Sequence, residues 1–180
     1  YVGRPPLRAF RPTGLQVIFA LLCNAGMENA RYREIAEAAN VALGTVGWVM
    51  QDLRQIGHIV EMGRRGRSLL KKKKLLERWV AAYPAQLKPK KLLGRFEATD
   101  PDWWKDAELP RRQAYWGGET AAAKLTEHLK PQGTTIYTSE LKALAEWMVR
   151  NKIRKAPNGN IEVIKTFWNF EPHWEHPALV

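Results

Sequence analysis

The chain has 180 residues, and 45% of them are hydrophobic, which is enough for a packed core and excludes wholesale disorder. The net charge of +11 is uneven: residues 1–100 hold 18 Lys and Arg against 8 Asp and Glu, whereas residues 101–180 hold 11 against 10. A basic half of this kind predicts a polyanionic partner. No apolar run of about 18 residues and no signal peptide is recognisable, so we expect no membrane-spanning helix and no membrane partner.

The chain begins at Tyr1 rather than at methionine and ends on the apolar residues 177–180, so we expect a fragment cut at one or both ends. Its one cysteine, Cys23, excludes a disulfide within the chain and fits a reducing compartment. We therefore expect a cytoplasmic protein in which Cys23 is a small buried hydrophobe rather than a reactive thiol.

The first expected helix begins at Thr13 and ends at Gly26. Thr13 and Gln16 have the spacing of a capping box, in which each side chain bonds the backbone N–H of the other residue. Apolar residues recur at helical spacing along this helix and predict one buried face. These residues are Leu15, Ile18, Phe19, Leu22 and Cys23.

The next stretch has the pattern of a helix-turn-helix followed by a strand. Apolar residues at helical spacing predict helices over residues 32–39 and 43–56. Asn40 tolerates the left-handed backbone that such a turn needs, and Gly57 is suited to cap the second helix. Residues 58–60 then predict a short strand.

The face of the second helix opposite its buried stripe carries the residues that a helix-turn-helix presents to DNA. Small residues near the helix start would allow close approach to a surface. Gln51 could bond a base edge, and Arg54 could reach a phosphate or a guanine. The simpler interpretation is an amphipathic helix pair with a solvated polar face. The expected DNA-facing residues are Gly44, Thr45, Gly47, Trp48, Gln51 and Arg54.

A hairpin with arginines at its tip is predicted directly after the strand. Two glycines bracket its turn, and Arg64, Arg65 and Arg67 suit contact with phosphate or the minor groove. The four lysines of residues 71–74 follow at once. We therefore favour a winged helix-turn-helix that binds double-stranded DNA over an inert fold. Trp48 could instead contact a dimer partner or another domain.

Residues 71–83 predict a further helix, which could link two domains or pack in a homodimer. Prolines punctuate residues 84–110, within which residues 92–98 predict a strand. The turn at residues 100–104 ends in two tryptophans, for which core packing is favoured over stacking on bases.

The second half alternates helices and strands. A helix is expected after residues 115–120, a strand over 134–138 and a helix capped by Ser139. The pair Asn158-Gly159 predicts a hairpin between strands at 153–155 and 161–165. The expected fold class is therefore α+β: a winged helix-turn-helix domain over residues 1–83 and a small α+β domain, truncated, over residues 84–180.

No catalytic constellation can be assembled from the sequence. His173 and His176 have a spacing that could hold a metal ion, but no third ligand is evident and a surface tail is favoured. The glycine pair before Glu119 is no phosphate loop, because no GK[ST] follows it. We therefore expect a protein that is not an enzyme, with no cofactor and no metal.

Several segments together carry a family likeness. They are REIAEAANVALGTV at 33–46, the basic helix at 71–76, DPDWW at 100–104, YWGGETAA at 115–122 and PNGNIEV at 157–163. The chain resembles the AbiEi-type antitoxins and transcriptional regulators of type IV toxin–antitoxin systems over most of its length. The first segment is generic, whereas YWGGETAA and PNGN are more specific.

This resemblance implies a winged-helix domain joined to an antitoxin domain, and repression of the protein's own promoter. It also implies that the protein counteracts a nucleotidyltransferase-like toxin without needing a stable complex with it. The sequence departs from the commonest arrangement, in which the winged helix lies at the extreme N-terminus, because residues before Tyr1 would make it internal. Only DNA contact is carried over, to residues 44–54 and 64–67; no antitoxin residue is assigned.

Two other classes stay open. One is a protein-interaction module, in which the aromatic second half binds a partner and the basic half is incidental. The other is a fragment of a nucleic-acid-processing enzyme whose catalytic part lies outside this chain.

Overall fold

A computed structural model describes residues 7–126 and 130–171. Its described residues form two compact units. The first, here the helical unit, comprises residues 7–90 and Phe167–Glu171; the second, here the sheet unit, comprises Lys91–Thr166. The described residues form both helices and strands, so the expected α+β class is confirmed. None of the helices in these described ranges has the length and apolarity that crossing a membrane requires.

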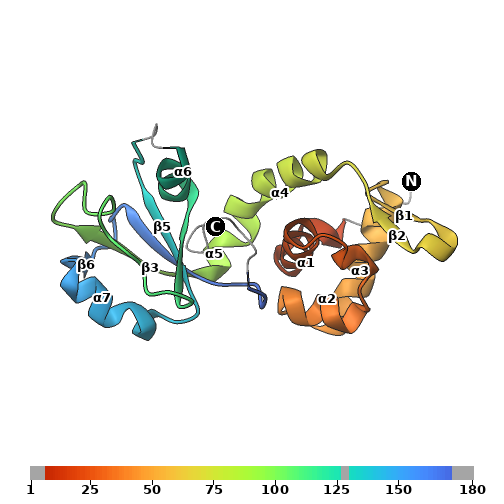
Figure 1. The fold of residues 1–180 in the computed structure, drawn as a ribbon, viewed down its shortest axis with the longest axis horizontal. Coiled ribbons are helices and arrows are strands. Elements are labelled where there is room, and N and C mark those ends of the chain that lie inside the picture. Colours follow the sequence, from red (N-terminus) through yellow and green to blue (C-terminus); the bar gives the residue numbers. More distant parts are fainter. Residues whose placement is uncertain (1–6, 127–129, 172–180) are drawn as a thin grey trace, which may run out of the picture. The chain divides into compact units, whose positions relative to one another are not determined.

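The helical unit has three core helices, a two-stranded hairpin and a fourth helix, with short 3-10 turns between them (Figure 1). Its side chains bury one apolar core to which all four helices and both strands contribute. The elements are η1 (Arg8–Phe10), α1 (Pro12–Cys23), η2 (Met27–Asn29), α2 (Tyr32–Ala39), α3 (Leu43–Gln55), β1 (Ile59–Glu61), η3 (Gly63–Arg65), β2 (Arg67–Leu69) and α4 (Lys72–Gln86).

The paired helices α2 and α3 lie where the sequence predicts them. Asn40 follows α2 with a left-handed backbone (φ 52°), and Gly57 follows α3 with φ 73°. Both residues therefore end a helix as expected, because asparagine and glycine accept this conformation at low cost. The hairpin pairs β1 with β2 in antiparallel register, with Ile59 opposite Leu69.

The start of α1 differs from the prediction. The helix begins at Pro12, with Arg11 at the N-cap position and no side-chain cap, so the capping box of Thr13 and Gln16 is wrong. Proline suits the first helical position because its missing N–H needs no partner there. Gln16 is buried instead, and its side-chain amide donates to the backbone carbonyl of Ala39 at 2.8 Å.

Helix α4 also extends further than expected, through Pro84 to Gln86 rather than ending near Tyr83. A proline within a helix leaves the carbonyl four residues earlier without its partner. That carbonyl belongs to Val80, an exposed residue, so water can satisfy it. The helix is held inside the unit by buried Leu75 and by Trp79, whose indole N–H donates to the Leu15 carbonyl at 2.8 Å.

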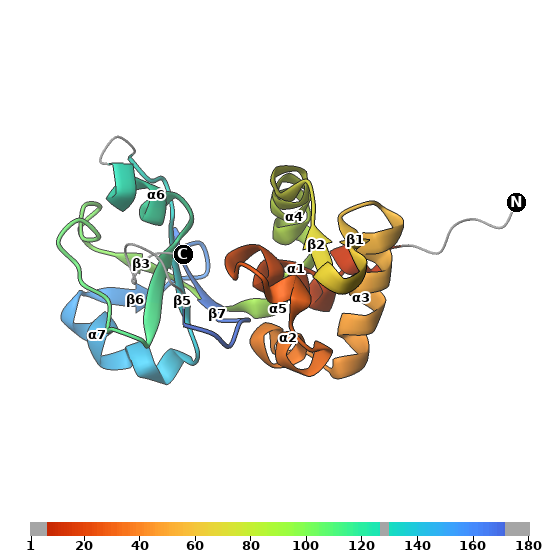
Figure 2. The same ribbon diagram turned by 45° about the vertical axis from the view of Figure 1, so that its right-hand side comes forward.

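The sheet unit contains a five-stranded mixed sheet with the strand order β4-β5-β7-β3-β6 (Figure 2). Only β5 and β7 pair in parallel; the other neighbours are antiparallel. Its elements, with the short helix that leads into it along the chain, are α5 (Lys88–Lys91), β3 (Leu92–Ala98), β4 (Ala114–Gly117), α6 (Gly118–Thr126), β5 (Thr134–Thr138), η4 (Leu141–Leu144), α7 (Ala145–Arg150), β6 (Ile153–Lys155) and β7 (Ile161–Lys165).

The hairpin expected at Asn158-Gly159 does not form. Strands β6 and β7 both exist, but β3 lies between them and pairs with each. Gly159 has no left-handed backbone, which the expected turn would require. A side chain there would instead collide with the carbonyl oxygen of Phe96 in β3. The glycine therefore serves the close approach of two backbones.

The helix after β5 begins differently from the prediction. Ser139 makes no cap, because the chain first forms the 3-10 turn η4 and enters α7 from Leu144. Leu144, Trp147 and Met148 are buried on the inner face of this segment. The predicted cap at Ser139 is therefore wrong, because the segment starts as a 3-10 turn.

Candidate nucleic-acid interface

Helix α3 presents an open face opposite its buried stripe. Val46, Val49, Met50 and Leu53 are buried, whereas Gly44, Trp48 and Gln51 are exposed and Thr45, Gly47 and Arg54 are half-buried. A Cβ atom added at Gly44 or at Gly47 would meet nothing within 4 Å. Neither glycine is therefore needed for packing inside the described protein.

Glycines at such positions weaken a helix. Each costs roughly 0.5–1 kcal/mol relative to alanine, because the unfolded backbone is freer and no side chain packs. Gly44 and Gly47 are three residues apart and so lie on the same side of α3. Together they leave a strip of bare backbone that another large molecule can approach closely.

The tip of the hairpin that follows α3 carries two cations. Arg64 and Arg65, in η3, are exposed, and within the described residues neither side chain makes a hydrogen bond or ion pair. The turn itself is closed by a hydrogen bond from the Met62 amide to the Gly66 carbonyl at 2.6 Å. The two guanidinium groups are thus held on a short, ordered turn and are free to bind an anion.

Arg67, the third predicted wing residue, is engaged inside the unit. Its side chain donates to the Ala30 carbonyl at 2.7 Å and lies 5.0 Å from the Tyr32 ring centre. Its backbone exchanges two hydrogen bonds with the Asn29 side-chain amide, at 2.6 and 2.7 Å. Arg67 therefore fixes the hairpin to the segment before α2.

Arg54 is held in the same way. It donates to the Glu61 carboxylate at 2.9 Å and to the Tyr32 hydroxyl at 3.0 Å. Burial lowers the pKa of Arg54, but the hydrogen bonds to Tyr32 and Glu61 outweigh it, and the net shift is upward. The side chain ties α3 to α2 and β1 through Nε and Nη2, and its contact with a base or phosphate stays a prediction.

Trp48 is exposed by 53%, yet one face of its ring is covered. The guanidinium carbon of Arg8 lies 4.5 Å from the ring centre. Sequence reasoning missed Arg8, Asn29 and Tyr32 as parts of this surface. These residues are far from their partners along the chain, and short-range periodicity cannot show such contacts.

Four exposed lysines extend the positive charge beyond the hairpin. Lys71 is the N-cap of α4, and residues 72–74 form its first turn. Cations are unfavourable at this end of a helix, because the helix dipole is positive there. An anion bound at this point would relieve that repulsion.

The tryptophans of the sheet unit belong to a core cluster. The Trp103 ring lies 5.7 Å from the rings of both Trp116 and Trp147, and Trp104 packs at the edge of the same core. The ammonium of Lys124 lies 5.0 Å from the Trp116 ring, and burial lowers its pKa. Core packing, the favoured interpretation of the tryptophan pair, is confirmed.

The described residues offer no assembled chemistry of other kinds. No group of three metal-ligating side chains is present in 7–126 and 130–171, and His173 and His176 lie outside the described residues. Burial raises the pKa of the Cys23 thiol to about 11, so it stays protonated at neutral pH.

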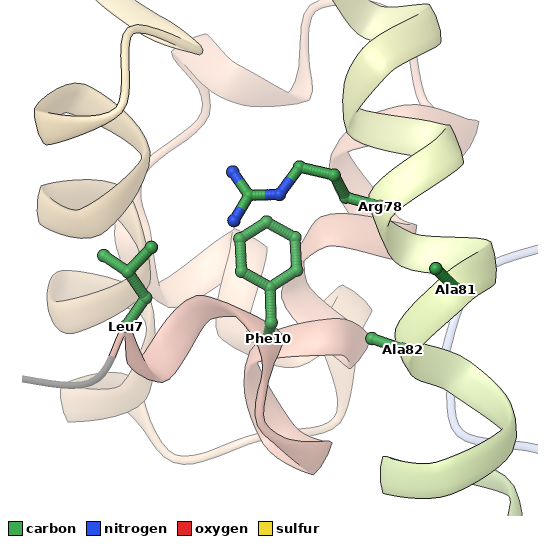
Figure 3. A pocket seen from close by; sticks show the side chains of 5 residues that line it. All are labelled: Leu7, Phe10, Arg78, Ala81 and Ala82. Carbon is green, nitrogen blue, oxygen red and sulfur yellow. The ribbon is translucent and has the colours of Figure 1, made fainter.

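An open hollow of about 500 Å³ in the helical unit is lined by Leu7, Phe10, Arg78, Ala81 and Ala82 (Figure 3). The Arg78 guanidinium lies 3.9 Å from the Phe10 ring centre. The lining contributes no second polar side chain, so it lacks the convergent polar groups of a small-molecule site.

These features define an α+β protein with a basic helical unit and a sheet unit that has tryptophans in its core. The family described as transcriptional regulator and AbiEi antitoxin of type IV toxin–antitoxin systems matches residues 68–180, more than half of the chain, and the chain belongs to it. The resemblance noted from the sequence is confirmed. No curated protein and no solved structure matches the chain. The match begins within β2, so α1, α2 and α3 precede the matched region.

Proposed function

We propose that this antitoxin-family protein is a DNA-binding repressor of its own operon and that its helical unit is a winged helix-turn-helix. The family supports the regulatory role, and the order of α1, α2, α3 and the hairpin supports the fold. The sheet unit is the antitoxin-like domain, with the boundary near residues 83–90. The protein acts without catalysis in the cytoplasm, against a nucleotidyltransferase-like toxin that it need not bind stably.

Two observations carry this proposal: the bare strip of α3, and the two exposed arginines at the tip of the hairpin that follows α3 along the chain. A recognition helix lies in the major groove with its first turns against the bases. Gly44 and Gly47 give α3 the close approach that this placement needs, and exposed Gln51 can bond an adenine edge. Arg64 and Arg65 at the hairpin tip then contact phosphates.

Binding to DNA from upstream of the protein's own operon should be compared with binding to a random duplex of equal length across a salt series. We expect tight binding to the upstream DNA that survives salt at which the random duplex dissociates. Equally weak and equally salt-sensitive binding to both duplexes would reject the specific repressor and favour the interaction-module alternative.

Replacing both wing arginines, Arg64→Ala with Arg65→Ala, should reduce the slope of log binding constant against log salt by about two units. The reason is that each phosphate contact releases about one counterion when the protein binds DNA, so a variant that lacks two contacts releases about two fewer. The matched control is Arg111→Ala with Arg150→Ala, which removes the same charge from exposed positions of the sheet unit. An unchanged slope in the wing variant would contradict the assignment.

Helix α4 is the proposed dimer contact. Leu76 and Val80 are exposed on it and lie four residues apart, on one side of the helix. A two-fold dimer would allow two copies of α3 to bind repeated half-sites one helical turn of DNA apart.

A further inference from the structure

Arg8 lies on η1, outside the predicted helix-turn-helix, yet it contacts the exposed face of α3. We propose that Arg8 is a further DNA-contact residue, which binds a backbone phosphate beside the recognition helix, and that Trp48 is its positioning residue. This inference rests on the proposed function, because it names an additional ligand group for the same surface.

The backbone of η1 is fixed on α3. The Ala9 amide donates to the Asp52 carboxylate at 2.9 Å, and the Ala9 side chain is fully buried. The Arg11 amide donates to the Arg8 carbonyl at 3.1 Å and closes the turn. Arg8 therefore projects from an anchored turn rather than from a loose tail.

The side chain of Arg8 is held by stacking alone. Its guanidinium carbon lies 4.5 Å from the Trp48 ring centre, and within the described residues it makes no ion pair and no side-chain hydrogen bond. Stacking occupies the flat face of a guanidinium and leaves the N–H groups on its edge unused. A cation held this way loses less conformational entropy when it binds an anion than a free side chain would.

The position of Trp48 places this cation at the edge of the recognition surface. Trp48 is one helical turn after Gly44 and three residues before Gln51, so all three lie on one side of α3. A helix seated in the major groove has backbone phosphates along both flanks. A planar guanidinium whose edge is free is well suited to bind two phosphate oxygens at once.

The pairing also changes the role expected for Trp48. With Arg8 over one ring face, only the other face of the tryptophan is open to a base. Arg8 and Trp48 should then act as one unit, and removing either partner should have nearly the same effect on DNA binding.

The test measures binding to the upstream duplex across a salt series for Arg8→Ala, Trp48→Ala, Trp48→Phe and the double alanine variant. We expect Arg8→Ala to reduce the salt slope by about one unit. Trp48→Ala should reduce the slope by nearly the same amount, and the double alanine variant should reduce it no further. Trp48→Phe should keep most of the slope, because phenylalanine also binds a cation. Circular dichroism confirms that each variant is folded.

Three outcomes would overturn the inference: an Arg8→Ala slope equal to that of the unaltered protein, additive losses in the double variant, or a Trp48→Ala variant that loses affinity with an unchanged slope. The last result would make Trp48 a base contact. If the wing variant lowers the slope and Arg8→Ala does not, this inference fails while the proposed function stands. If the unaltered protein shows no preference for the upstream DNA, both fail.

Discussion

Replacing Phe167 with alanine is expected to lower the free energy of unfolding of the helical unit by about 3–5 kcal/mol. The side chain is only 1% exposed, and its ring lies 5.0 Å from those of Phe19 and Trp168 and 6.3 Å from that of Trp79. Truncation to alanine leaves a cavity among aromatic rings that cannot easily collapse. Urea unfolding followed by circular dichroism measures the loss.

The same segment supports the turn between α2 and α3. The buried Gln16 amide donates to the carbonyls of both Phe167 and Ala39, at 3.0 and 2.8 Å. The Asn169 amide donates to the Ala38 carbonyl at 2.8 Å. The C-terminal end of α2 is thus bonded to residues that follow the last strand, and the helical unit needs both parts of the chain.

Phe170→Ala is the matched control, because Phe170 lies in the same segment but is only half-buried. Phe170→Ala should lower the free energy of unfolding clearly less than Phe167→Ala does. A chain ending at Thr166 should lose at least as much stability as Phe167→Ala, and residues 1–90 alone should not form a stable helical unit. A Phe167→Ala loss below about 1 kcal/mol would show that the segment is not part of this core.

The helix pair could be predicted from sequence because its determinants are local. Periodic apolar residues define α2 and α3, and Asn40 and Gly57 mark their ends through backbone preference alone. The buried stripe of α3 and the open face opposite it follow from the same pattern. For this reason the expected positions of the small residues on that face agree with the structure.

The uses of Arg54 and Arg67 could not be predicted in this way. A sequence shows that an arginine is present, but not whether a carboxylate or carbonyl from a distant segment already binds it. Arg67 meets Ala30, which is 37 residues earlier, and the Gln16–Phe167 bond spans 151 residues. The hairpin predicted at Asn158-Gly159 is wrong for a related reason, because glycine serves close packing as well as tight turns.

Gly44→Ala and Gly47→Ala are each expected to raise the free energy of unfolding by about 0.5–1 kcal/mol. Alanine is the better helix former, and the added methyl group at either position meets nothing within 4 Å. Gly14→Ala in α1 is the control for stability. There the added methyl group would collide with the carbonyls of Arg8 and Ala9, so the same substitution should destabilise the protein.

The same two variants are expected to bind the upstream DNA more weakly, by about tenfold or more, because each lost base contact costs about 1–3 kcal/mol. The added methyl group would hold α3 away from the floor of the groove. Binding to random duplex, which depends mainly on phosphates, should change less.

The opposite signs of these two effects make the measurement decisive. If the open face of α3 were only a solvated surface, both alanine variants would gain stability and keep their affinity for DNA. A variant that is better folded yet binds worse cannot owe its defect to unfolding. Such a result would mean that Gly44 and Gly47 serve contact with DNA rather than stability. Unchanged affinity would instead show that the open space at these two glycines is not a DNA interface.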